Sequence, residues 1–174
     1  MRSYRMRSIK LLCTATFICL IFQGCGFYKF NGISTDAQTF QVNYFQNEAS
    51  IVEPGIERTF TLALQDLIQD QSSLSLVSNG GEILFEGEIV EFYIAPQAST
   101  SDNTAAQNRL TIAVNVRYYN NNRQDGEDDF ERRFSFFSDV GAATQLTGTA
   151  LDTALEEIYE RITQDIVNAS LAQW

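Results

Sequence analysis

The side chains that could do chemistry are few. The chain has no histidine, so Ser-His and Cys-His nucleophile pairs and histidine-ligated zinc sites are excluded. Carboxylate pairs remain as candidates for glycoside hydrolysis. The candidates are Glu86, Glu88 and Glu91, but a spacing of about two residues is also what the solvated face of a strand gives. We therefore expect no enzyme and no catalytic residue.

The acidic segment Asp125–Asp129 suggests calcium at first sight. With Gly126 placed at the glycine position of an EF-hand loop, Arg123 and Arg132 fall on two ligand positions. Cations there exclude the motif. We expect a solvated turn at this segment, and no metal or other cofactor.

Arginines are sparse in this acidic chain, and four of them lie on two segments that we expect to pair as strands. They are Arg109, Arg117, Arg132 and Arg133. A guanidinium binds phosphate or carboxylate through two parallel hydrogen bonds. The sequence leaves two interpretations open: cross-strand pairing with carboxylates such as Glu86, Glu88 and Glu131, or a small patch that contacts an anionic lipid.

The N-terminus has the pattern of a secretory signal. Four basic residues and no acid precede a run of twelve mostly apolar residues, Leu11 to Phe22, which is too short to span a bilayer. Gln23-Gly24-Cys25 follows, as in a bacterial lipoprotein signal whose cysteine becomes the first mature residue. We expect residues 1–24 to be removed, Cys25 to be acylated, and residues 25–38 to form a lipidated tether.

Charge and cysteine content agree with this interpretation. Of three cysteines, two (Cys13 and Cys19) lie in the predicted signal, so residues 26–174 hold no thiol. Removal of residues 1–24 leaves eight basic and 22 acidic side chains, a net charge of 8 − 22 = −14. Nucleic-acid binding is not expected, because it needs a basic surface.

The 150 residues that remain after the predicted signal suit one domain, which we place at residues 39–174, after the tether. Periodicity near 3.6 predicts amphipathic helices from Ile56 to about Gln69 and from Thr149 almost to Trp174, the second opening with a capping box of Thr149 and Asp152. Period-two alternation and β-branched composition predict strands at Thr39–Phe45, Leu74–Val77, Ile83–Ile94 (with a bulge or close approach near Gly87), Leu110–Tyr118 and around 130–136. In the first of these, we expect Phe40, Val42 and Tyr44 to share one half-buried face.

Each predicted helix has one apolar stripe, and the clearest strand has one apolar face. This predicts an α+β two-layer sandwich, with both amphipathic helices packed on one face of a small, mostly antiparallel sheet.

Several segments resemble the LptE family of lipopolysaccharide-assembly lipoproteins, in the form found in Bacteroidota. They are CGFYKFNG after the predicted lipidation site, RTFTLALQDLIQDQSSLSLV, GEILFEGEIVEFYIAPQA, TAAQNRLTIAVNVRYYN, and the C-terminal helix that ends in Trp174. None is a catalytic signature. The resemblance rests on pattern and order over almost all of residues 25–174.

The resemblance implies an outer-membrane lipoprotein that plugs the lumen of the LptD β-barrel, assists its assembly and takes part in lipopolysaccharide insertion. The four arginines named above become candidate lipopolysaccharide contacts. Gly26–Asn31 holds no acidic run of the kind that marks surface export, so we expect the domain to face the periplasm and the barrel lumen. The alternative is an independent periplasmic lipoprotein that binds a lipid or a glycan.

Overall fold

Three long antiparallel strands form the centre of the sheet. They are β4 (Ile83–Gln97), β5 (Gln107–Asn120) and β6 (Phe130–Gly141), in the spatial order β4-β5-β6. The alternation on β5 directs Leu110, Ile112, Val114, Val116 and Tyr118 into the core. Val114 lies opposite Ile89 on one side and Phe134 on the other, so the apolar rows of the three strands coincide.

The computed structural model describes residues 35–51, 53–97, 107–123, 126–141 and 144–172. The predicted signal (residues 1–24), Cys25 and the tether up to residue 34 lie outside the described residues, as do residues 98–106 between β4 and β5 and Trp174. At the end of the predicted tether, Ala37 is buried and the backbone N–H of Gln38 donates to the Glu82 carboxylate.

Short parallel strands extend the sheet along the other side of β4. β1 (Thr39–Val42) and β2 (Gln46–Asn47) both pair with β4, and β3 (Ser75–Leu76) pairs with β1. Together the described residues form a six-stranded mixed sheet in the order β3-β1-β4-β5-β6, with β2 beside β4.

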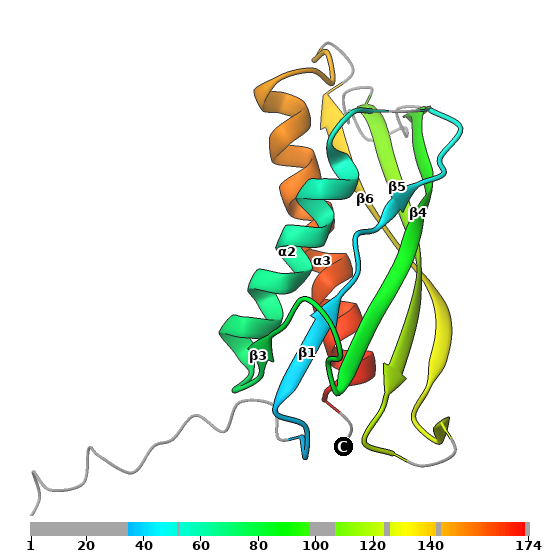
Figure 1. The fold of residues 1–174 in the computed structure, drawn as a ribbon. Coiled ribbons are helices and arrows are strands. Elements are labelled where there is room, and N and C mark those ends of the chain that lie inside the picture. Colours follow the sequence, from blue (N-terminus) through cyan, green and yellow to red (C-terminus); the bar gives the residue numbers. More distant parts are fainter. Residues whose placement is uncertain (1–34, 52, 98–106, 124–125, 142–143, 173–174) are drawn as a thin grey trace, which may run out of the picture. The chain divides into compact units, whose positions relative to one another are not determined.

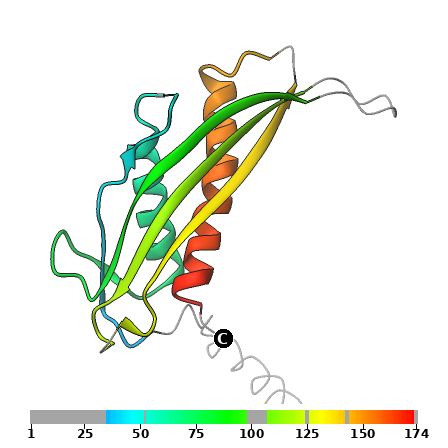
Figure 2. The ribbon, with the colours of Figure 1, turned by 90° about the vertical axis from the view of Figure 1, so that its right-hand side faces the viewer.

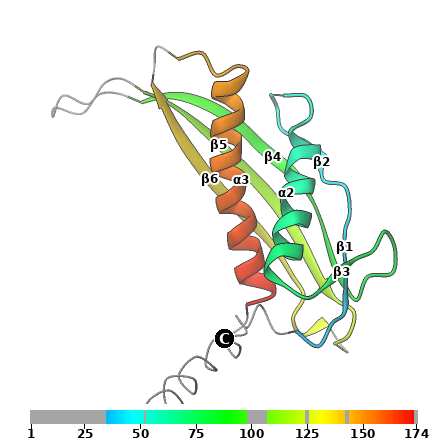
Figure 3. The same cartoon turned by 90° about the vertical axis from the view of Figure 1, so that its left-hand side faces the viewer.

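Two helices cover one face of this sheet. α2 (Ile56–Gln71) and α3 (Thr149–Ser170) lie side by side and run in the same direction, and Figures 2 and 3 show the sheet on one side of them. Neither helix combines the length and the apolar character that a membrane span needs. The predicted fold class, an α+β two-layer sandwich with both helices on one face, is confirmed (Figure 1).

An aromatic chain links the sheet to both helices. The Phe45 ring meets the edge of Phe60 on α2 at a centroid distance of 5.0 Å, and Phe60 meets Tyr159 on α3 at 5.3 Å. The Tyr159 hydroxyl donates to the Ile56 carbonyl (3.2 Å), and the Phe45 N–H donates to the Thr61 hydroxyl (3.2 Å). All three rings are buried, and the Tyr159 hydroxyl and the Phe45 N–H both have hydrogen-bond partners within the core.

Two local predictions are wrong. The strand alternation does not continue to Tyr44: after Val42 the chain leaves the β1 ladder, Phe45 enters the core and Tyr44 is exposed. The capping box does not form either. Gly148, with φ +56°, is the N-cap and Thr149 is already helical, so the Thr149 hydroxyl does not cap the helix.

Gly87 marks a close approach, as predicted, whereas the bulge lies further along β4, between Ile89 and Glu91. A Cβ on Gly87 would overlap the Asn115 carbonyl oxygen and lie 2.8 Å from Cε1 of Phe45. Only glycine lets Phe45 pack against this part of β4 while β5 stays paired on it.

Gly87→Ala should therefore lower the free energy of unfolding by about 1–3 kcal/mol, because the methyl group forces β5 or Phe45 to move. Gly141→Ala is the matched control, since its Cβ would meet only the Thr144 hydroxyl at 3.6 Å. Urea unfolding followed by circular dichroism measures both. Equal stability of the two variants would contradict the packing described here.

Candidate functional site

The sheet face opposite the helices carries three of the four arginines singled out from the sequence. Arg109, Arg117 and Arg133 lie on this open face, because they alternate with the buried residues of β5 and β6. Arg132 belongs to the other face of β6, is exposed, and lies over the Phe130 ring at 5.2 Å. The structure therefore does not bring all four into one patch.

Arg117 is held between two carboxylates of β4. Its Nε lies 3.3 Å from Oε1 of Glu86 and its Nη2 lies 2.9 Å from Oε2 of Glu88. Asn43 donates a further hydrogen bond to Glu86 at 3.0 Å. The hydrogen bond to Glu88, followed by that to Glu86, raises the pKa of Arg117 above its ordinary value.

The other two open-face arginines are paired as well. Arg133 on β6 bonds Glu91 of β4, across the width of β5. Arg109 forms a two-pronged pair with Asp139, Nε to Oδ1 at 2.7 Å and Nη2 to Oδ2 at 2.8 Å, and its guanidinium lies 3.7 Å from the centroid of the Phe137 ring. These bonds hold the pKa of Asp139 below its ordinary value.

The three carboxylates considered for glycoside hydrolysis are thus ion-pair partners. Glu86 and Glu88 share Arg117, and Glu91 binds Arg133. Cross-strand pairing, one of the two interpretations left open by the sequence, accounts for their positions. In the described part of the chain, no three histidine, cysteine or acidic residues converge in a geometry that could hold a metal ion.

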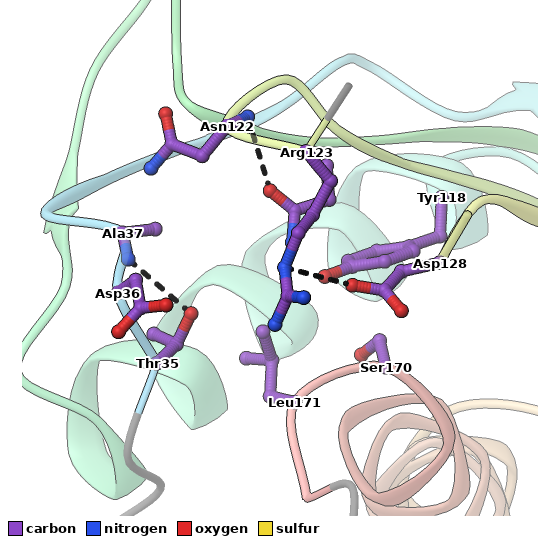
Figure 4. A pocket seen from close by; sticks show the side chains of 10 residues that line it. Thr35, Asp36, Ala37, Tyr118, Asn122, Arg123, Asp128, Ser170 and Leu171 are labelled. Atoms are coloured by element: carbon purple, nitrogen blue, oxygen red, sulfur yellow. Dashed lines mark hydrogen bonds and ion pairs between the residues drawn. The ribbon is translucent and has the colours of Figure 1, made fainter. Parts of the chain in front are cut away.

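A polar pocket of about 350 Å³ lies at the end of the domain where the described chain begins (Figure 4). Ten residues from four separate segments line it: Thr35, Asp36, Ala37, Tyr118, Asn120, Asn122, Arg123, Asp128, Ser170 and Leu171. Sequence reasoning missed the pocket, because no single segment carries a pattern for it. The acidic segment contributes Asp128, which pairs with Arg123 at 3.4 Å, while Asp125 lies outside the described residues.

The phenol of Tyr118 forms the inner wall of the pocket. Its ring stacks on Phe130 and tilts against Phe85, both at a centroid distance of 5.2 Å. Burial, with smaller contributions from Asp128 and Asp129, raises the pKa of Tyr118 to about 12. The hydroxyl therefore stays protonated, and able to donate a hydrogen bond, at neutral pH.

Solved structures with a similar fold come from several bacteria. Protein XCC0632 from Xanthomonas campestris has a TM-score of 0.55 and 12% identity, over 81% of this chain and 90% of that chain. The hypothetical protein CT253 from Chlamydia trachomatis has a TM-score of 0.53 and 9% identity, over 79% of this chain and 99% of that chain. At such identities the likeness shows the fold alone. The uncharacterized lipoprotein B from Nitrosomonas europaea is 17% identical, over 85% of this chain and 89% of that chain, with a TM-score of 0.42.

No functionally curated protein sequence matches the chain. The family model of LptE, described as lipopolysaccharide-assembly, matches residues 37–170. That range runs from the buried Ala37 to the last residue of α3 and so includes every helix and strand described here.

The Arg109–Asp139 pair predicts a pH-dependent contribution to stability. Because the folded-state pKa of Asp139 is depressed, the contribution is complete above the unfolded pKa of about 3.9 and is lost as pH falls through the folded value. Arg109→Gln should therefore be less stable than the wild type near neutral pH. The gap should shrink as pH falls below about 3.9 and Asp139 becomes protonated.

Urea unfolding of both proteins across this pH range measures the gap. Asp139→Asn is the matched control, because it removes the titrating group and should flatten the difference. A gap between the wild type and Arg109→Gln that stays constant with pH would contradict this role for Asp139.

Proposed function

The chain belongs to the LptE family of lipopolysaccharide-assembly lipoproteins, and from this premise we propose that it plugs an LptD β-barrel in the outer membrane. In this role it assists assembly of the barrel and takes part in inserting lipopolysaccharide into the outer leaflet. The observation that carries the proposal is the family match, which spans the whole described domain. The Bacteroidota form is the one that the sequence segments resemble.

The open face of the sheet supports a place inside a barrel. The inner wall of a membrane barrel is polar. A charged surface that docks there loses water, and an unpaired buried charge is costly. Here Arg109, Arg117 and Arg133 already have carboxylate partners on the same face, so docking leaves none of these three cations without a partner.

The family is associated with the outer membrane and is not enzymatic. We propose that acyl chains on Cys25 hold this member there, and that the domain faces the periplasm and the barrel lumen. The lipoprotein pattern of Gln23-Gly24-Cys25 and the absence of an acidic run in Gly26–Asn31 support this orientation.

Lipopolysaccharide contact through the four candidate arginines is also a proposal, and the structure ranks them. Phosphate would have to compete with a carboxylate that is already in place at Arg109, Arg117 and Arg133. Arg132 is exposed and has no ion-pair partner among the described residues. Arg132 is therefore the first candidate for a phosphate of lipopolysaccharide.

Co-purification tests the partnership. The tagged lipoprotein, extracted from native membranes in a mild non-ionic detergent, should bring down an outer-membrane β-barrel that mass spectrometry identifies as LptD. An unrelated lipoprotein with the same tag, at the same expression level, is the control. Recovery of a barrel-free monomer that binds a lipid or glycan unaided would instead favour the independent binding module.

Arg132→Ala should weaken binding of purified lipopolysaccharide by about tenfold at low salt, and by less at high salt, because the lost contact is a charged hydrogen bond. Arg161→Ala is the control: Arg161 is also exposed and lies over the Phe136 ring at 5.6 Å, but it pairs with Asp165 at 3.7 Å. Surface plasmon resonance on immobilised lipopolysaccharide measures both. Equal loss in the two variants would remove Arg132 as a specific contact.

A further inference from the structure

The polar pocket of Figure 4 has no part in the function proposed above. It lies where the chain enters the domain, with Thr35 on its wall, only ten residues after Cys25. Ten extended residues reach at most about 35 Å. With Cys25 acylated, the pocket therefore stays close to the membrane surface.

The hydroxyl of Tyr118 offers a ligand in the pocket a hydrogen-bond donor. Tyr118 is only 2% exposed, and its hydroxyl is not among the fully buried polar atoms of the described residues that lack a partner, so it is accessible from the pocket. Within residues 35–172, as far as they are described, none of the hydrogen bonds involves this hydroxyl, which opens into the pocket (Figure 4). Because Phe85 and Phe130 pack on the ring, the hydroxyl cannot turn away to find another partner.

Charges of both signs surround this hydroxyl. The Nε of Arg123 pairs with Asp128, and the rest of the guanidinium points into the pocket (Figure 4). Asp36, on the opposite wall, is exposed and forms no hydrogen bond or ion pair with the other described residues. A guanidinium matches a phosphate, and a carboxylate matches an ammonium group that has N–H donors.

We propose that this pocket binds a phosphoethanolamine group. The phosphate accepts hydrogen bonds from Arg123 and from the Tyr118 hydroxyl, and the primary ammonium group donates to Asp36. A membrane phospholipid and a decorated glycolipid are two sources of the same group. The membrane source rests on the proposed anchor at Cys25, whereas recognition of the group does not.

Isothermal titration calorimetry of the full lipoprotein, in maltoside detergent, with glycerophosphoethanolamine as the probe tests the site. We expect saturable binding that weakens at least about tenfold in Asp36→Asn and in Arg123→Gln, which lose a charged hydrogen bond. Tyr118→Phe keeps the ring and should weaken binding by about two- to tenfold. Arg161→Gln on α3, away from the pocket, is the matched control and should bind as the wild type does.

Glycerophosphocholine separates this site from general phosphate binding, because its quaternary ammonium has no N–H to donate to Asp36. Equal affinity for the two probes would overturn the proposal. No saturable binding up to about 10 mM would overturn it too. Circular dichroism of each variant shows whether a loss of binding reflects unfolding. Asp36→Asn should keep the wild-type spectrum, because Asp36 is exposed and has no hydrogen-bond or ion-pair partner among the described residues.

Nanodiscs distinguish the sources. Protection of the Arg123 segment from hydrogen exchange in discs of phosphatidylethanolamine, but not of phosphatidylcholine, supports a membrane lipid as the occupant. Equal protection in both discs, together with binding of the soluble probe, supports a phosphoethanolamine group carried by another molecule. Failure of these experiments leaves the co-purification of a barrel unaffected, so the two proposals fail separately.

Discussion

The contact of Phe45 with Gly87 is the constraint on which the arrangement of the two layers depends. Phe45 is the sheet-side end of the aromatic chain that continues through Phe60 of α2 to Tyr159 of α3. It can lie there only because Gly87 has no side chain, since any Cβ would meet both the Phe45 ring and the Asn115 backbone. The position of both helices along the sheet, and the pairing of β4 with β5, are therefore set at one place.

Ion pairs connect residues across the open face of the sheet, as aromatic packing connects residues on the covered face. The row that contains Glu86, Arg117 and Glu131 and the row that contains Glu88, Asn115 and Arg133 cross all three long strands. Pairs of this kind in partial contact with water contribute little stability individually. Their main effect is on the surface itself. The arginines of this face already have carboxylate partners, so phosphate must compete with those carboxylates to bind them.

The sequence predicted most of the fold, because two periodicities are strong in it. The alternation from Leu110 to Tyr118 and the apolar stripe from Leu151 to Ile166 each identify a buried face without tertiary information. The failures are local, and tertiary packing decided them. Phe45, and not Tyr44, lies in the core because Gly87 leaves space for its ring. Thr149 does not cap α3 because Gly148 occupies the N-cap position and Thr149 is already helical. The pocket could not be predicted, since its residues come together only when the start of the domain, the β5–β6 connection and the end of α3 meet.

Charge also limits how a protein of this family can meet an anionic glycolipid. α2 and α3 carry eight acidic residues against Arg58 and Arg161, so the helical layer repels phosphate over a distance of about 8 Å, the screening length at physiological salt. On the three long strands the open face carries three arginines against five acidic residues, and at the end where the described chain begins Arg123 projects into a pocket. Long-range attraction therefore cannot bring lipopolysaccharide to this chain. Contact requires delivery to short range by another component, which is the role that a surrounding barrel would fill.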